Sequence, residues 1–108
     1  MIKEVKEMYY QQGDVIIEKI ETLPQNLKSL PHRVLADGEV TGHKHVVAEE
    51  ELSDLFVDEN GNLFLKTSGR TTVKHEEHKP ITIEPGNYKI RRVQEYDHFE
   101  EEARNVRD

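Results

Sequence analysis

Short runs of β-branched and aromatic residues recur along this chain, and each run ends at a glycine, a proline or a group of charges. Apolar and polar residues alternate most clearly in Ile81-Thr82-Ile83, as they do in a half-buried strand. The interior shows no clear amphipathic 3.6-residue repeat, so it predicts no long helix. Strands are expected at residues 15–20, 33–36, 40–48, 52–57, 62–66, 70–74, 80–84 and 88–96.

Turn-forming residues separate these runs. Residues 58–61, Asp-Glu-Asn-Gly, lie between two apolar runs and predict a hairpin, and the Ser68-Gly69 pair predicts the next turn. Asp37-Gly38 predicts another hairpin turn. Residues 23–31 are bracketed by prolines and lack periodicity, so a surface loop with at most one helical turn is expected there.

The strand count and the glycine-bearing turns predict an all-β fold, namely a small antiparallel barrel or sandwich of seven to eight short strands with polar terminal arms. A closed or nearly closed barrel is preferred because closure removes exposed strand edges. The expected division is an N-terminal arm at 1–12, a β-barrel domain at 13–97 and a C-terminal tail at 98–108.

Charge and composition exclude several functions. The net charge of −7 disfavours nucleic acid and anionic membranes as partners, because both require clustered lysine and arginine. No apolar run approaches the roughly 20 residues of a membrane span. The chain lacks cysteine, so thiolate chemistry and disulfides are excluded. We expect a cytoplasmic protein of a bacterium or an infected host cell.

Four of the six histidines fall into two short clusters. His43 and His45 are two residues apart, so in a strand both point to one face and can reach a common metal ion. His75 and His78 are three apart and converge only if the chain between them breaks its alternation, which a proline at position 80 favours. The sequence therefore predicts a metal site of His43, His45, His75 and His78, provided that the two segments are neighbours.

Carboxylates accompany these histidines. Glu39, Glu76 and Glu77 are candidates for an oxygen ligand or a general base, although the sequence assigns no reaction and leaves enzyme or sensor open. The expected cofactor is a divalent ion, and imidazole ligands suit zinc, iron, nickel, copper or manganese alike. Two other interpretations remain open, a metal-free polar pocket or interface and a plain solvated surface.

Other candidate chemistry is limited. Arg91 and Arg92 on the last expected strand form a weak candidate hook for an anionic ligand, which would make the domain a small-molecule binding module. Salt-bridged or solvated arginines are the competing interpretation. The serines lack the glycine context of a nucleophile elbow, so serine hydrolase chemistry is not expected.

The Gly38-x4-His43-x-His45 segment resembles the first half of the cupin metal motif, in which a glycine precedes His-x-His and a glutamate follows. This resemblance implies a cupin-like barrel, with the run at 49–51 near the glutamate position. Two differences set the chain apart from cupins. The glycine spacing is one residue short, and His78 precedes the Pro85-Gly86 turn that the second cupin motif places before its histidine.

The chain as a whole resembles a set of small uncharacterised bacterial and phage proteins. The shared motifs cover most of residues 12–97. They comprise Gln12-Gly13-Asp14-Val15, Gly38-Glu39-Val40-Thr41-Gly42-His43-x-His45, His75-Glu76-Glu77-His78-x-Pro80-Ile81, Pro85-Gly86-x-Tyr88 and an arginine-rich strand that ends Glu95-Tyr96-Asp97. The resemblance implies where the site begins and ends in the sequence, and it implies no reaction. It also keeps an alternative function open, a non-enzymatic assembly protein such as a phage structural component, whose arms contact further copies or virion partners.

Overall fold

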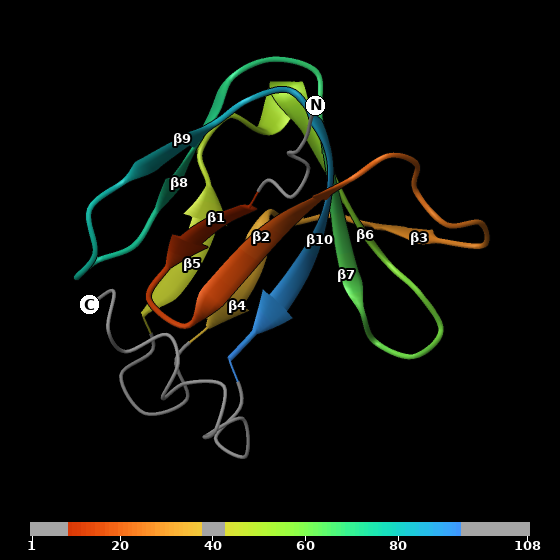
Figure 1. The fold of residues 1–108 in the computed structure, drawn as a ribbon, viewed down its shortest axis with the longest axis horizontal. Helices are drawn as coiled ribbons and strands as arrows, with labels where there is room; N and C mark the ends of the chain where they lie inside the picture. The colour runs from red at the N-terminus through yellow and green to blue at the C-terminus, as the bar shows by residue number, and fades with distance from the viewer. Residues whose placement is uncertain (1–8, 38–42, 94–108) are drawn as a thin grey trace, which may run out of the picture.

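The structure is a computed structural model that describes residues 9–37 and 43–93. In these ranges ten strands form two antiparallel sheets (Figure 1). The larger sheet has the order β1 (Tyr9–Gln12), β2 (Val15–Ile20), β10 (Gly86–Arg92), β7 (Leu63–Thr67), β6 (Ser53–Val57) and β3 (Lys28–Leu30). The smaller sheet has the order β4 (Val34–Asp37), β5 (Lys44–Val47), β8 (Thr71–Lys74) and β9 (Ile81–Ile83), and a single 3-10 turn, η1 (Glu50–Leu52), precedes β6.

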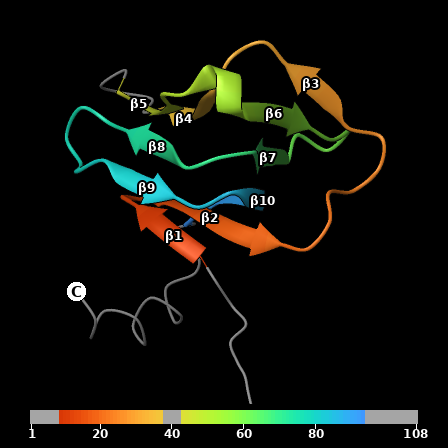
Figure 2. The same ribbon diagram turned by 90° about the horizontal axis from the view of Figure 1, so that it is seen from above.

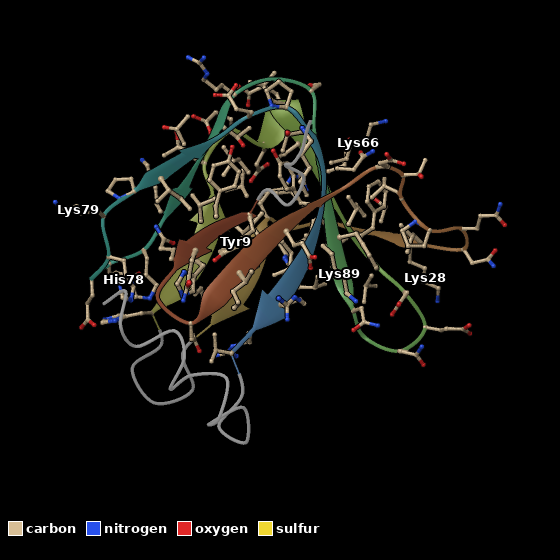
Figure 3. All side chains as sticks on the ribbon, viewed as in Figure 1. Tyr9, Lys28, Lys66, His78, Lys79 and Lys89 are labelled. Atoms are coloured by element: carbon tan, nitrogen blue, oxygen red, sulfur yellow. The ribbon has the colours of Figure 1, made fainter. Side chains whose placement is uncertain are left out.

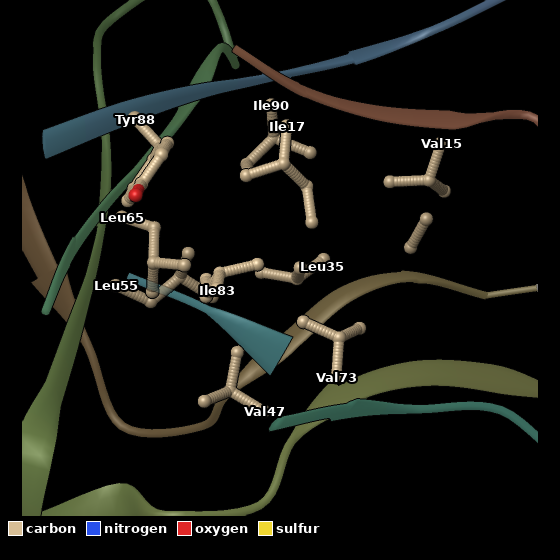
Figure 4. Close-up of a cluster of buried hydrophobic side chains, with 11 residues drawn as sticks. Val15, Ile17, Leu35, Val47, Leu55, Leu65, Val73, Ile83, Tyr88 and Ile90 are labelled. Carbon is tan, nitrogen blue, oxygen red and sulfur yellow. The ribbon is translucent and has the colours of Figure 1, made fainter. Parts of the chain in front are cut away.

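The two sheets face one another and enclose one apolar core. Viewed from above, β1, β2 and β10 lie on one side and β4 and β5 on the other (Figure 2). Inward-pointing residues of β2 and of β4 to β10 supply this core, and the close-up shows their side chains meeting between the layers (Figure 4). The fully buried members are Val15, Ile17, Val47, Leu55, Leu65, Val73, Ile83 and Tyr88.

The all-β prediction is confirmed, and the architecture is a sandwich. Of the preferred closed or nearly closed barrel, full closure is wrong, because no backbone ladder joins the two sheets in the described ranges. Side chains of edge strand β1 reach the β9 segment instead, and the backbone amide of Glu84, which follows β9, donates to the Tyr10 hydroxyl at 3.2 Å. The prolines at 80 and 85 limit β9 to three residues, which leaves little backbone for a ladder. The cupin-like barrel that the resemblance implies is therefore not closed in these ranges.

Most strand predictions are confirmed, and two segments differ. Residues 15–20 form β2, and the predicted hairpin joins β6 to β7 with Val57 paired to Leu63. The expected loop at 23–31 contains β3, which pairs with β6 and depends on that partner rather than on local periodicity. Residues 9–12 of the expected arm form β1. The rest of both arms lies outside the described residues, and in the described ranges no helix could span a bilayer.

Candidate metal centre

The pairing of β5 with β8 brings the two histidine clusters together. Val46 pairs with Lys74 and Val47 with Val73, so the register continues to place His45 opposite His75. The ring centroids of these two histidines are 4.2 Å apart. The predicted metal site requires the two histidine segments to be neighbours. The antiparallel ladder between β5 and β8 meets this requirement.

The chain then breaks its alternation between His75 and His78. Strand β8 ends at Lys74, and residues 75–80 bend before β9 begins. The Glu77 amide donates to Nδ1 of His75 at 3.0 Å, which closes a tight local turn. His78 consequently turns back, and its ring centroid lies 4.6 Å from that of His75 and 6.0 Å from that of His45. Figure 3 shows His78 at the end of the molecule where the β1–β2 turn lies.

His43 completes the cluster from the start of β5. Its ring meets that of His75 edge to face, with centroids 5.6 Å apart. Its Nδ1 lies 3.5 Å from Oε2 of Glu77. The structure therefore gathers all four histidines that the sequence singled out, together with carboxylates from the turn that separates His75 from His78.

Gln12 of β1 holds this cluster in place, and its side chain is only 3% exposed. Its Nε2 donates to the carbonyls of Val73 at 3.1 Å and Lys79 at 2.8 Å. These two carbonyls bracket the second histidine segment, so one amide ties both ends of that segment to β1. These two bonds use both amide hydrogens of Gln12 and fix the orientation of the amide. Its oxygen, Oε1, can only accept, and it lies 2.8 Å from Nδ1 of His45.

This contact defines the chemical state of His45. Its Nδ1 carries the hydrogen, so Nε2 keeps a free lone pair. Burial, reinforced by the charge of nearby His75, lowers the pKa of His45 to about 4, although the Asp14 carboxylate partly opposes this. Nε2 of His45 lies 3.9 Å from Oδ1 of Asp14. His45 is thus a neutral imidazole at pH 7, with the tautomer and the outer hydrogen bond typical of metal-ligating histidines.

The β1–β2 turn approaches the cluster closely at Gly13. The φ angle of Gly13 is +61°, and a Cβ built at this position would lie 2.7 Å from Nε2 of His78. Glycine adopts this positive φ without steric cost, and it lacks the Cβ that would clash with His78. The next residue, Asp14, forms an ion pair with Arg92 at 3.0 Å. The turn therefore contributes a close backbone approach and an anchored carboxylate to the edge of the cluster.

Three side chains meet the geometric requirement for a shared ion most closely. One ligand atom each of His43, His75 and Glu76 lies within 4.8 Å of the other two. Glu76 also accepts a hydrogen bond from the Lys44 amide at 3.1 Å. Hydrogen bonds from its own amide and from that of Lys44 hold the pKa of Glu76 below its ordinary value, so the carboxylate is charged at neutral pH.

The remaining predicted site residues lie in different places. Glu39 is outside the described residues. The guanidinium of Arg91 pairs with Glu18 at 3.1 Å, and that of Arg92 pairs with Asp14, so an anion at either arginine would first have to displace a carboxylate. Sequence reasoning assigned no role in the site to Gln12, whose only signal was its place in the first motif of the resembling proteins.

Comparison with known families adds one finding. The chain matches a domain of unknown function, DUF8820, over residues 11–93. The chain belongs to the DUF8820 family. The DUF8820 domain contains Gln12, both histidine clusters and Glu76, so the whole candidate centre lies within the family region. No curated protein and no solved structure matches the chain.

Proposed function

We propose that this DUF8820 domain binds one divalent metal ion through His43, His75 and Glu76, with His45 and His78 bordering the site as further imidazole donors. The observation that carries the proposal is the convergence of three ligand atoms within 4.8 Å of one another. Two imidazoles and a carboxylate form a donor set that zinc and other divalent transition metals accept.

The spacing fits an ion after small side-chain movements. Zinc–ligand bonds of about 2.0–2.2 Å place ligands on one ion about 3–4 Å apart. His43 and His75 are partly exposed and Glu76 is exposed, so these side chains have room to close that difference. Nδ1 of His75 accepts the Glu77 amide, so ligation through this nitrogen requires that hydrogen bond to open. Ligation through Nδ1 of His75 is therefore expected to shift the amide resonance of Glu77.

The neighbouring imidazoles define what such an ion could do. A site with three protein ligands leaves at least one position for water or for another ligand, and a bound zinc ion lowers the pKa of its water. His45 is neutral and keeps its lone pair on Nε2, so it could accept a proton from a nearby donor. The proposal concerns metal binding and assigns no reaction.

Calorimetric titration of the tag-free protein with zinc tests the proposal. We expect one zinc per chain. His75→Asn removes a ligand and should weaken zinc binding by at least about tenfold, because loss of a residue that only hydrogen-bonds to a ligand already costs that much. His32→Asn is the matched control. Like His75, His32 accepts through Nδ1 a hydrogen bond from the backbone amide two residues ahead, that of Val34 at 3.1 Å. His32, however, lies in an exposed turn away from the cluster. Absence of zinc binding, or an equal effect of both variants, would contradict the proposal.

The assembly role remains an alternative that depends on the terminal arms. Residues 1–8 and 94–108 lie outside the described part of the chain. Light scattering of the full chain and of a variant lacking residues 99–108 tests this alternative. A micromolar monomer that is unchanged by the deletion would remove its support.

A further inference from the structure

A pocket of about 270 Å³ opens next to the proposed metal ligands. Its lining residues are Lys44, Val46, Lys74, His75 and Glu76. His45 and Val47 are buried on the inner face of β5, so Lys44 and Val46 point to the outer face of the small sheet. His75 and Glu76 belong both to the pocket and to the group that can hold a metal. The pocket and the metal site therefore share two of their residues.

Two ammonium groups give this pocket its charge. Lys44 and Lys74 come from the paired strands β5 and β8 and are exposed. Within the described ranges, neither ammonium forms an ion pair. Glu49 lies close enough to Lys74 to feel its charge, but its carboxylate oxygens accept the Thr72 amide at 2.7 Å and hydroxyl at 3.1 Å. Two cations therefore face the pocket in a protein whose net charge is −7.

The carboxylate in the pocket does not cancel this charge once a metal is bound. Glu76 is held by the Lys44 amide and belongs to the proposed ligand set. When a divalent ion sits on His43, His75 and Glu76, the ion and the two lysines contribute four positive charges. The carboxylates of Glu76 and of Glu77, which lies 3.5 Å from His43, contribute two negative charges. Val46 supplies an apolar surface between the two lysines, because it is paired with Lys74 and follows Lys44 by two residues.

We propose that this pocket binds a small oxyanion, a phosphate or carboxylate group, next to the metal. This inference rests on the metal site proposed above. One oxygen of the anion occupies a coordination position that the protein leaves open, and its other oxygens pair with the ammonium groups of Lys44 and Lys74. The apolar surface of Val46 contacts the part of the ligand that follows its charged group. The ligand class is therefore a small organic phosphate or carboxylate that binds only to the metal-loaded domain.

Titration of the zinc-loaded, tag-free protein with inorganic phosphate, and separately with acetate, tests this inference and distinguishes the two groups. Zinc content is measured before and after each titration. Lys44→Gln and Lys74→Gln should each weaken anion binding by about tenfold, the loss expected for one charge-assisted hydrogen bond, and should leave one zinc per chain. Lys66→Gln is the matched control, because Lys66 is also an exposed strand lysine but lies on the other sheet and should not matter.

The outcomes separate the two proposals. If the protein retains zinc but binds neither anion, or if the lysine variants bind as wild type does, the anion site is wrong and the metal site stands. If the metal-free protein binds an anion as well as the zinc-loaded protein does, the proposed coordination by the metal is wrong. If the protein retains no zinc, the metal site fails and the anion site that depends on it fails too.

Discussion

Replacing Gln12 with methionine tests how the histidine cluster is held together. Methionine is also long and unbranched, but it has neither an amide donor nor a carbonyl acceptor. The substitution removes three hydrogen bonds, those to the Val73 and Lys79 carbonyls and the one from His45. It leaves these three partners with little access to water, because the Gln12 side chain is buried.

The expected cost follows from these three bonds. Each contributes about 1 kcal/mol net, and a buried partner left without a bond costs about as much or more, so Gln12→Met should lower the free energy of unfolding by about 3 kcal/mol. A domain of this size has a total stability of about 5–15 kcal/mol. The corresponding fall in melting temperature is at least about 12 °C.

Urea denaturation of the metal-free protein measures the effect, and Gln11→Met is the control. Gln11 is the preceding residue of the same strand, but it is exposed and makes one side-chain bond, to the Gly13 carbonyl at 3.0 Å. Gln11→Met should lower the free energy of unfolding by less than about 0.5 kcal/mol. If Gln12→Met costs less than about 1 kcal/mol, or no more than the control, Gln12 does not hold the cluster as described.

Three further predictions concern the same core and turn. Burial lowers the pKa of His45 from 6.5 to about 4, so as the pH falls the unfolded chain binds this proton before the folded chain does. The free energy of unfolding of the metal-free protein should therefore fall by up to about 3 kcal/mol between pH 6.5 and pH 4. In a plot of stability against pH, His45→Gln should flatten this part of the curve. Gly13→Ala and Gly61→Ala should both cost the backbone strain of a positive φ, about 1–2 kcal/mol in urea denaturation. Only Gly13→Ala also meets a nearby side chain, so it should cost more than Gly61→Ala and shift the ring resonances of His78. Thr71→Val should leave the melting temperature unchanged or raise it, because the buried Thr71 hydroxyl has no hydrogen-bond partner in the described ranges.

The sequence predicts the strands that carry their own local signal. The β-branched run of β2 and the Asp58–Gly61 turn between β6 and β7 are local features, and the Asp58 carboxylate accepts the Asn60 and Asn62 amides inside that turn. The sequence does not predict β3, because Lys28-Ser29-Leu30 has no strand pattern of its own and is a strand only as the partner of β6. The choice between barrel and sandwich depends on whether distant edges pair, which no local pattern encodes.

The candidate site was predictable in part for the same reason. The His43 and His45 pair follows from strand alternation, and Pro80 signalled the break that turns His78 back. The role of Gln12 could not be found this way, because its three bonds join residues 33 to 67 positions away. Only the packing of β1 against the smaller sheet shows that one buried amide orients His45 and ties both ends of the second histidine segment.

X-ray absorption at the zinc edge, on tag-free protein loaded with one equivalent of zinc and dialysed, tests the metal site most directly. We expect retained zinc with at least two imidazole nitrogens and a carboxylate oxygen at about 2.0–2.2 Å, and loss of one imidazole signal in His43→Asn. Zinc that is lost on dialysis, or that is surrounded by oxygen alone, would contradict a metal centre built on His43, His75 and Glu76.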